Sequence, residues 1–363
     1  MTAELTLSRM TPSPLAELDL RRVAQRANIL ANIRACLALD GYVEVEVPEL
    51  VVSTGACEDL DMYNVEMFGD LAFLRQTGQL YLEEVVIRGM EKAYCEGQSF
   101  RKEPASGDGR HLCEFRLIEI EKQGMDLEEL VASEARMLQY IVDHLDPHLF
   151  DERTLERLHA EVDDGIPTIT YRDAITLLNR MGADLTFGDD ISRHDEQRLV
   201  HEFGKGGLTI VQHPTEIKFF NMLVNREDPE VVDSCDLILR DGGETFGSSV
   251  RDTDPESMRT RLHGKPMYQY MLNRAESFAT EAARLYSYTP EQEQREAQRI
   301  AAQIDRSFED YFALIASNPV PRAGYGLGVA RLFQYIFGAQ SIDEAVTFPV
   351  TRLSFGGGSP SSR

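Results

Sequence analysis

The sequence predicts an α+β fold in which a mostly antiparallel sheet is flanked by helices. Segments typical of strands occur at mixed spacing, and some are joined as hairpins rather than through long crossovers. Helical hydrophobic spacing is strong in residues 20–40 and 127–145. The order of these segments departs from the regular strand–helix alternation of a doubly wound fold. This order excludes the doubly wound class and favours the α+β class.

Composition narrows the class of protein further. The chain has 363 residues, of which 42% are hydrophobic and 27% charged, as in ordinary globular proteins. The net charge of −24, with no run of Lys and Arg, argues against a large nucleic-acid-binding or membrane-binding surface. Five scattered cysteines without a Cys-x-x-Cys pair predict reduced thiols. No apolar run reaches the roughly 18 residues of a membrane span. We expect a cytoplasmic protein.

The expected organisation is one main domain with two short extensions. Residues 1–19 contain Thr-Pro-Ser-Pro and predict an arm, residues 20–352 hold the periodic segments, and residues 353–363 predict a flexible tail. Within the main domain, the helix at 20–40 is followed by an alternating segment that ends at Pro48. This pair is suited to a subunit interface or, equally, to ordinary packing inside one chain.

The richest stretch for chemistry runs from Phe100 to Glu121, FRKEPASGDGRHLCEFRLIEIE. It predicts a strand, a Gly/Ser/Asp-rich loop and a second strand. Arginine side chains there could hold phosphates, and an exposed phenylalanine could stack on a base. On this stretch alone, a solvated and charge-rich hairpin is equally consistent.

Two further clusters favour a nucleotide site. Asp236 and Glu244 are eight residues apart and could share Mg²⁺. Arg331 lies one turn into a predicted helix that follows Gly324-x-Gly326-x-Gly328, where the backbone can approach a phosphate. These glycines do not have the spacing of a dinucleotide-binding fingerprint. Cations, paired carboxylates and an aromatic ring are what a nucleoside triphosphate requires.

With these clusters in their order, the chain resembles the catalytic domain of class II aminoacyl-tRNA synthetases of the aspartyl/asparaginyl/lysyl subgroup. Residues 20–49 resemble motif 1, the dimer-interface helix and strand. Residues 100–115, Phe-Arg-x-Glu through Arg-His-Leu-x-Glu-Phe, resemble motif 2. Residues 324–331, Gly-x-Gly-x-Gly-x-x-Arg, resemble motif 3. The resemblance covers about residues 20–350.

Within the subgroup, the chain is most similar to the asparaginyl branch. The stretch at 76–83, QTGQLYLE, is similar to the Gly-Gln-Leu-x-x-Glu of that branch, and Cys57-Glu58 to its Cys-Glu. Arg322 stands where the family has a histidine, and Ala330 and Ser248 replace an acid and a glycine.

The resemblance implies a role for each matching residue. Arg101 and Arg331 would be catalytic, Arg101 gripping the α-phosphate and the attacking carboxylate, and Arg331 holding the outer phosphates with Arg110 and His111. Phe115 would stack on adenine, and Glu103 would contact its amino edge. The implied ATP-binding set is Arg101, Glu103, Arg110, His111, Phe115, Gly328 and Arg331. The implied metal ligands are Asp236 and Glu244.

The implied amino-acid pocket consists of Glu58, Gln76, Gln79, Glu83 and Arg251. Glu58 and Gln79 would take the substrate α-ammonium, Arg251 the side-chain oxygen, and Glu83 would lie near a side-chain amide. Taken alone, Glu58 and Glu83 are equally consistent with exposed acids. An arginine fork suits an aspartate-like carboxylate, and an Arg/Glu pair suits an asparagine-like amide.

Three functions are compatible with this reading. Because only about 20 residues precede the motif 1 helix, where the subgroup has an anticodon-reading domain, the main expectation is a tRNA-independent, AMP-forming ligase. It would activate aspartate with ATP and Mg²⁺ and transfer it to ammonia or a small amine, as an asparagine synthetase of this family does. The alternatives are a truncated asparaginyl/aspartyl-tRNA synthetase paralogue that charges tRNA or another carrier, and a non-catalytic sensor. We expect a homodimer formed through motif 1, and tRNA as an unlikely partner.

Overall fold

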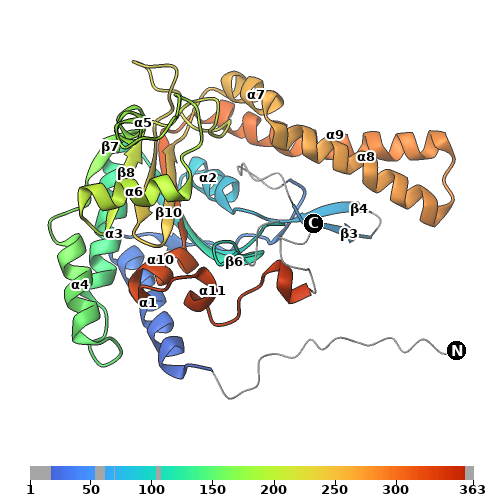
Figure 1. Ribbon diagram of the computed structural model, residues 1–363. Coiled ribbons are helices and arrows are strands. Elements are labelled where there is room, and N and C mark those ends of the chain that lie inside the picture. The colour runs from blue at the N-terminus through green and yellow to red at the C-terminus, as the bar shows by residue number, and fades with distance from the viewer. Residues whose placement is uncertain (1–17, 54–61, 69, 104–107, 356–363) are drawn as a thin grey trace, which may run out of the picture.

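The computed structural model describes residues 18–53, 62–68, 70–103 and 108–355 (Figure 1). Eleven strands occur in these ranges: β1 (Val43–Glu44), β2 (Leu50–Val51), β3 (Asn64–Met67), β4 (Asp70–Leu74), β5 (Lys92–Phe100), β6 (Glu114–Gln123), β7 (Thr168–Thr170), β8 (Gly207–Val211), β9 (Ser234–Leu239), β10 (Gly243–Val250) and β11 (Arg322–Gly328).

Helices alternate with these strands only in part of the chain. They are α1 (Leu20–Leu39), α2 (Gln79–Ile87), α3 (Leu127–Asp143), α4 (Glu152–Val162), α5 (Tyr171–Arg180), α6 (Arg193–Phe203), α7 (Pro255–Gly264), α8 (Pro266–Tyr286), α9 (Pro290–Ser317), α10 (Val329–Phe337), α11 (Ile342–Ala345) and a 3₁₀ turn at Arg352–Phe355. In these described ranges, no helix is long and apolar enough to cross a membrane.

The main sheet has eight strands in the order β1-β5-β6-β11-β10-β9-β8-β7, and a second sheet has the order β2-β4-β3. All neighbours in the main sheet pair antiparallel except β1 with β5 and β7 with β8, which lie at its two edges. The predicted hairpin at residues 100–121 is confirmed, because β5 and β6 pair antiparallel from Lys92↔Lys122 to Phe100↔Glu114. The predicted α+β class with a mostly antiparallel sheet is confirmed.

The two faces of β6 have different neighbours. Ile118 and Ile120 are buried in the largest hydrophobic cluster, which they share with side chains of α1, α3 and α10. Because side chains alternate along a strand, Leu117, Glu119 and Glu121 lie on the opposite face. This second face carries the cavity described below, so the apolar core under α1 and α3 fixes the polar residues of the site.

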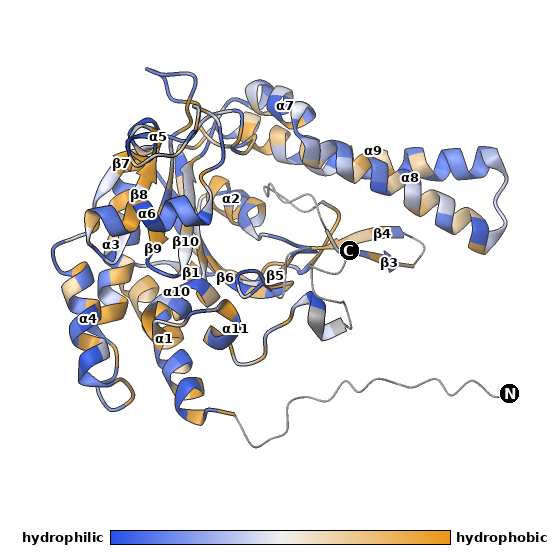
Figure 2. Cartoon of the chain, in the orientation of Figure 1, coloured by the Kyte–Doolittle hydropathy of each residue, from blue (hydrophilic) through white to orange (hydrophobic). Residues whose placement is uncertain are grey.

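Helices α7, α8 and α9 form a second apolar cluster around Phe220. Figure 1 shows α8 and α9 side by side, extending away from the main sheet as a long helical pair. The side chain of Thr289 caps the start of α9 in a capping box with Gln292. In Figure 2 strand β8 has the hydrophobic colour over much of its length, whereas α9 is largely hydrophilic.

Two strands of the main sheet are short. Strand β8 ends at Val211, because Gln212 has a φ of 60° and Pro214 lacks the N–H that a ladder needs. The strand predicted for 42–48 pairs only at Val43–Glu44, with one further hydrogen bond from Val45 to Tyr94. The expected arm at 1–19 and tail at 353–363 fall largely outside the described residues, and the proposed division into domains stays a prediction.

A glycine on β11 is required by close packing. A Cβ at Gly324 would overlap the carbonyl oxygen of Ile120 and Oε2 of Glu121 on the neighbouring strand. We therefore predict that Gly324→Ala lowers the free energy of unfolding by about 1–3 kcal/mol or more, measured by urea denaturation. The matched control is Gly264→Ala in α7, where a Cβ has nothing within 4 Å. That change should alter stability by no more than about 1 kcal/mol. Equal effects at both positions would contradict the packing argument.

Candidate active site

A cavity of about 430 Å³ lies on the polar face of β6, between β10, β11, the start of α10 and residues 218–222. It is lined by eleven of the side chains that the sequence singled out: Gln79, Arg101, Glu103, Arg110, His111, Phe115, Asp236, Glu244, Arg251, Gly328 and Arg331. Segments far apart in the chain therefore meet at one place. The individual role of each residue stays a prediction.

Two of the described residues that were predicted for the site, Gln76 and Glu83, do not line this cavity. Gln76 is fully buried, and its backbone carbonyl accepts a hydrogen bond from Ser99. Glu83 is also fully buried, one layer behind the cavity wall, so the open alternative of an exposed acid does not hold for it. Glu58 lies outside the described residues.

Arginine side chains surround one end of the cavity. The guanidinium of Arg101 lies 5.0 Å from the ring centroid of Phe115, within cation–π distance. Arg331, on the first turn of α10, donates to the backbone carbonyl of Glu244 on β10. Asp108 accepts hydrogen bonds from the backbone N–H groups of Arg110 and His111 at 2.8 and 3.2 Å, which fixes the loop before β6. This end of the cavity is suited to a polyanion.

Two carboxylates converge at the same end. A Cβ at Gly247 would lie 2.7 Å from Oε1 of Glu244 and 3.9 Å from Oδ1 of Asp236. Both carboxylates therefore lie beside the backbone of Gly247, on the side where another residue would have its side chain. Oxygen ligands of this type suit Mg²⁺. Oδ2 of Asp236 also accepts from Lys218 at 2.7 Å. The residues present therefore fit a divalent cation.

His213 orients one of these carboxylates from behind. Its Nε2 lies 3.1 Å from Oδ2 of Asp236, and its Nδ1 lies 3.0 Å from Oγ of Ser234. Burial, aided by the positive charge of Lys218, holds the pKa of His213 well below its usual value, so the ring is neutral. A neutral ring that accepts from Ser234 at Nδ1 donates from Nε2 to Asp236, which fixes the direction of this carboxylate.

A network of buried charges supports the other end of the cavity. Glu83, Glu121, Arg251 and Arg322 are each at most 5% exposed. Arg322 donates to Oε2 of Glu83 through Nε at 2.9 Å and Nη2 at 2.5 Å, and Tyr311 donates to the same oxygen at 2.7 Å. Arg251 donates to Glu121 through Nη2 at 3.2 Å. Burial raises the pKa of Glu121 to about 7, and the charge of Arg251 opposes that rise.

Several residues at the cavity were not found from the sequence. Glu119 accepts hydrogen bonds from the Thr77 hydroxyl and the Gly78 N–H, and it lines the wall beside Gln79. The sequence signal that could have revealed Glu119 is the alternation of side chains along β6, which places Glu119 on the same face as Leu117. Lys218 and Asn221 line the cavity from the irregular segment between β8 and β9.

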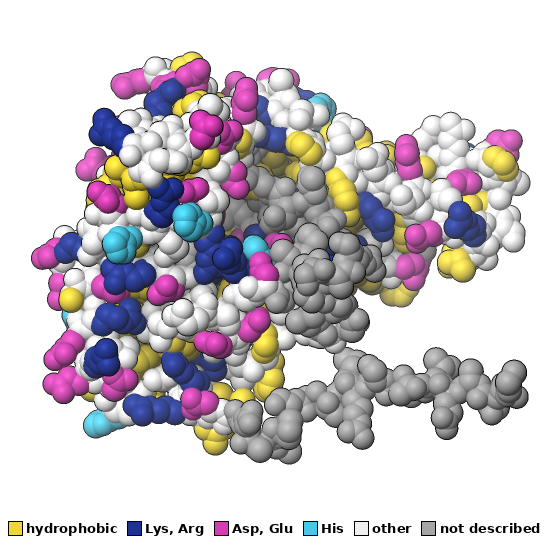
Figure 3. Space-filling model, viewed as in Figure 1, with side chains coloured by type: hydrophobic (Ala, Val, Ile, Leu, Met, Phe, Trp, Pro, Cys, Tyr) yellow, Lys and Arg dark blue, Asp and Glu magenta, His cyan; other side chains and the backbone are white. Residues whose placement is uncertain are grey.

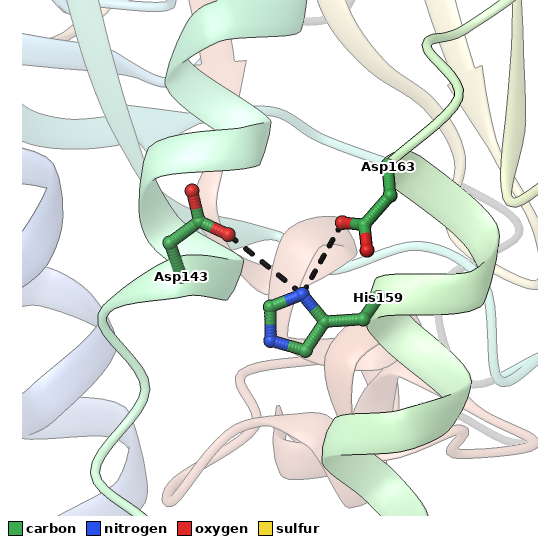
Figure 4. A group of neighbouring side chains, drawn as sticks. All are labelled: Asp143, His159 and Asp163. Carbon is green, nitrogen blue, oxygen red and sulfur yellow. Dashed lines mark hydrogen bonds and ion pairs between the residues drawn. The ribbon is translucent and has the colours of Figure 1, made fainter.

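A separate cluster lies away from the cavity, where α3 meets α4 (Figure 4). Nδ1 of His159 lies 3.7 Å from Oδ1 of Asp143 and 3.2 Å from Oδ1 of Asp163. Hydrogen bonds from Gln139 and His159 lower the pKa of Asp163. Its two carboxylates are exposed and the contacts are those of surface ion pairs, which contribute little to stability.

The chain matches a known protein family and known proteins of that family. The family model described as tRNA synthetases class II (D, K and N) matches residues 17–352. The asparagine–tRNA ligase of Pelotomaculum thermopropionicum is 30% identical over 316 residues, which is 85% of this chain and 64% of that protein. The asparagine–tRNA ligase of Pyrococcus furiosus is 30% identical over 341 residues, 90% of this chain and 67% of that protein.

A solved structure agrees with these relatives. The crystal structure of asparaginyl-tRNA synthetase from Pyrococcus horikoshii complexed with asparaginyl-adenylate superposes with a TM-score of 0.74 at 26% identity, covering 94% of this chain and 73% of that one. The expected resemblance to the catalytic core of the asparaginyl/aspartyl subgroup is confirmed. The chain spans about two thirds of the length of the curated relatives it matches.

The main functional expectation is wrong. The relatives that match are tRNA ligases over nearly the whole chain, which argues against a tRNA-independent aspartate–ammonia ligase and against tRNA as an unlikely partner. The expectation combined the short segment before the motif 1 helix with the net charge, and a net charge averages over the whole surface. Figure 3 shows basic and acidic side chains standing side by side on one face, so a total of −24 does not describe a local surface.

The contribution of the buried Glu83–Arg322 ion pair to the free energy of unfolding can be tested by mutation. Arg322→Met removes the cation from a fully buried carboxylate, and we predict a loss of about 3–5 kcal/mol in the free energy of unfolding. Arg299→Met is the control, because Arg299 is half exposed and its pairs with Asp70 and Glu296 lie at the surface. The control should cost less than about 1 kcal/mol. Urea denaturation of both variants checks this, and an Arg322 loss no larger than the control would refute the pairing.

Proposed function

Because the chain belongs to the family of class II tRNA synthetases (D, K and N), we propose that it activates asparagine or aspartate with ATP and Mg²⁺ and transfers the amino acid to tRNA. The observation that carries the proposal is the single cavity in which the hairpin arginines, Arg331 of α10 and the carboxylates Asp236 and Glu244 converge. The names of the relatives favour asparagine.

The proposed reaction has two steps. In the first, a carboxylate oxygen of the amino acid attacks the α-phosphorus of ATP, the bond from that phosphorus to the β-bridging oxygen breaks, and pyrophosphate leaves. In the second, a ribose hydroxyl at the tRNA end attacks the acyl carbon, the acyl–phosphate bond breaks, and AMP leaves with its electron pair. The protein contributes positioning and charge stabilisation, and no covalent intermediate on the chain is needed.

Arginine and histidine side chains would hold the phosphates. Arg101 would neutralise the α-phosphate as negative charge builds there, while Arg331, Arg110 and His111 would hold the β- and γ-phosphates. The cation–π contact of Arg101 with Phe115 supports a stacking role for this ring, because its face already packs against a flat cation. Asp236 and Glu244 would hold Mg²⁺, which supplies charge neutralisation of the phosphate oxygens.

The opposite end of the cavity would hold the amino acid. Its α-ammonium needs a negative group, and Glu119 lines the wall with its carboxylate held by Thr77 and Gly78. Gln79 lies next to it and donates its side-chain N–H to Glu121, which leaves its carbonyl as the acceptor for an ammonium. Arg251 would contact the side chain of the substrate, as the resemblance implied.

Activation and transfer can be measured separately. We expect asparagine-dependent or aspartate-dependent ATP–pyrophosphate exchange, followed by transfer of the labelled amino acid to tRNA. Release of AMP only when ammonia is added, with no labelled tRNA, would overturn the proposed acceptor.

Arg101→Ala tests the assigned site, and we expect exchange to fall by about 100-fold or more. Arg116→Ala is the matched control. Arg116 belongs to the same hairpin, but it pairs with Glu96 at 2.7 Å and does not line the cavity. Exchange that survives Arg101→Ala would show that the motif assignment is wrong.

We further propose that the protein forms a homodimer through α1 and β1. Three large apolar side chains of these two elements are exposed in the single chain: Leu20 at 71%, Leu39 at 74% and Val43 at 48%. Leu39→Asp would place a charge on this surface, so we expect analytical ultracentrifugation to show a shift from dimer toward monomer. A wild-type monomer at micromolar concentration would contradict the proposal.

A further inference from the structure

Segment 341–350, which follows α10, connects the proposed phosphate end of the cavity to α1. It contains the four-residue helix α11 and meets β6 at a bridge between Val350 and Glu114. A helix of one turn is not stable by itself. The position of segment 341–350 is therefore set by the side chains and backbone groups of other elements.

Segment 341–350 forms a hydrogen bond on each side of two proposed phosphate ligands. The N–H of Ile342 donates to the carbonyl of Gly109 at 2.8 Å, and the N–H of Cys113 donates to the carbonyl of Val350 at 2.7 Å. The stretch 110–112, which carries the arginine and histidine of the loop before β6, lies between these two bonds. The backbone from which those two side chains extend is thus fixed by segment 341–350.

Apolar packing joins the same segment to the third proposed phosphate ligand. Leu112, Ala330 and Ile342 are buried against one another, and all three line the cavity. Ala330 directly precedes Arg331 on the first turn of α10. The side chain of Ile342 therefore packs beside residues adjacent in the chain to all three proposed ligands of the outer phosphates.

Arg26 of α1 holds segment 341–350 from the side opposite the cavity. The side chain of Arg26 is almost fully buried, and all three of its nitrogen atoms donate to this segment. Nε donates to the carbonyl of Ala345 at 2.6 Å, Nη2 to the carbonyl of Glu344 at 3.3 Å, and Nη1 to the hydroxyl of Thr347 at 3.1 Å. The last carbonyl groups of a helix have no partner within it, so Arg26 satisfies two of them at the end of α11.

Helix α1 provides a firm base for this contact. Ile29 and Ile33, on the turns that follow Arg26, are fully buried in the largest hydrophobic cluster. A side chain on this helix starts from a fixed backbone, so its contacts define where segment 341–350 lies.

Resting on the proposed function, we propose that Arg26 is a positioning residue for ATP. Arg26 does not line the cavity. It fixes segment 341–350, and that segment places Arg110 and His111 at the β- and γ-phosphates. The groups proposed for the amino acid lie on α2 and β6, away from these contacts, so the effect of Arg26 falls on ATP and not on the amino acid.

Arg26→Met tests this role in the full-length protein. A misplacement of about 1 Å at a reacting group can cost about 100-fold, so we expect at least about tenfold weaker binding of Mg-ATP by calorimetry. In ATP–pyrophosphate exchange the KM for ATP should rise by at least about tenfold, while the KM for the amino acid changes by less than about twofold. Arg26→Lys offers one nitrogen for three acceptors and should recover only part of the loss.

Arg22→Met is the matched control on the same helix. Arg22 lies 4.2 Å and Arg26 lies 5.6 Å from the ring centroid of Phe337 on α10. The control removes a cation from this ring but leaves the three hydrogen bonds to segment 341–350. We expect it to keep the wild-type affinity for ATP. An equal loss in Arg22→Met would show that the effect runs through α10 and would overturn the inference.

Thr347→Val is a milder variant in case Arg26→Met folds poorly. It replaces the hydroxyl that accepts from Nη1 of Arg26 by a methyl group of similar size, at a position that does not line the cavity. Loss of one hydrogen bond should weaken the binding of Mg-ATP by about two- to fivefold.

Three results would contradict one or both proposals. Unchanged affinity for ATP in a folded Arg26→Met or Thr347→Val protein, or an equal rise in both KM values, overturns the positioning role. A wild-type protein that binds Mg-ATP but shows no exchange with any amino acid overturns the proposed function alone. A wild-type protein that does not bind Mg-ATP overturns both.

Discussion

Four buried charges beneath the cavity hold together elements from the whole length of the chain. Glu83 belongs to α2, Glu121 to β6, Arg251 follows β10, and Arg322 begins β11. Each is almost completely removed from water, where an unpaired charge would be strongly unfavourable. Since the two acids and two bases satisfy one another only in one arrangement, the network fixes how these four elements meet. The end of the cavity that we propose for the amino acid lies next to this network, since Arg251 belongs to both.

The phosphate end depends on a different principle. Its cations come from the ends of β5 and β6 and from the start of α10, where chain direction and backbone access leave groups available to a ligand. Its acids, Asp236 and Glu244, converge over a glycine that leaves room above the sheet. The two ends of the site therefore combine a rigid buried network with a more open polar surface.

The sequence predicted local features well where residue type and spacing had one physical reading. The hairpin at 100–121, the helices at 20–40 and 127–145 and the helix that follows the glycine-rich segment 324–328 were predicted from periodicity and turn residues. The orientation of the Asn221 side chain could not be predicted in this way, because it donates to Glu83, which lies 138 residues away in the chain. Likewise, burial of Glu83 depends on Arg322 and Tyr311, which no local pattern connects to it. Long-range pairing of charges was thus the part of the site that local patterns could not give.

The helical pair α8–α9 extends from the body of the molecule, yet its base contacts the buried charges behind the cavity. Tyr311 of α9 donates to Glu83 at 2.7 Å and lies 3.3 Å from Nη2 of Arg322. Phe308 and Phe312, on either side of it in the chain, pack against Phe220, which is next to Asn221 in the chain. The base of this pair therefore supports the buried charges behind the cavity wall, and a displacement of α9 at Tyr311 would be transmitted to Glu83 and Arg322.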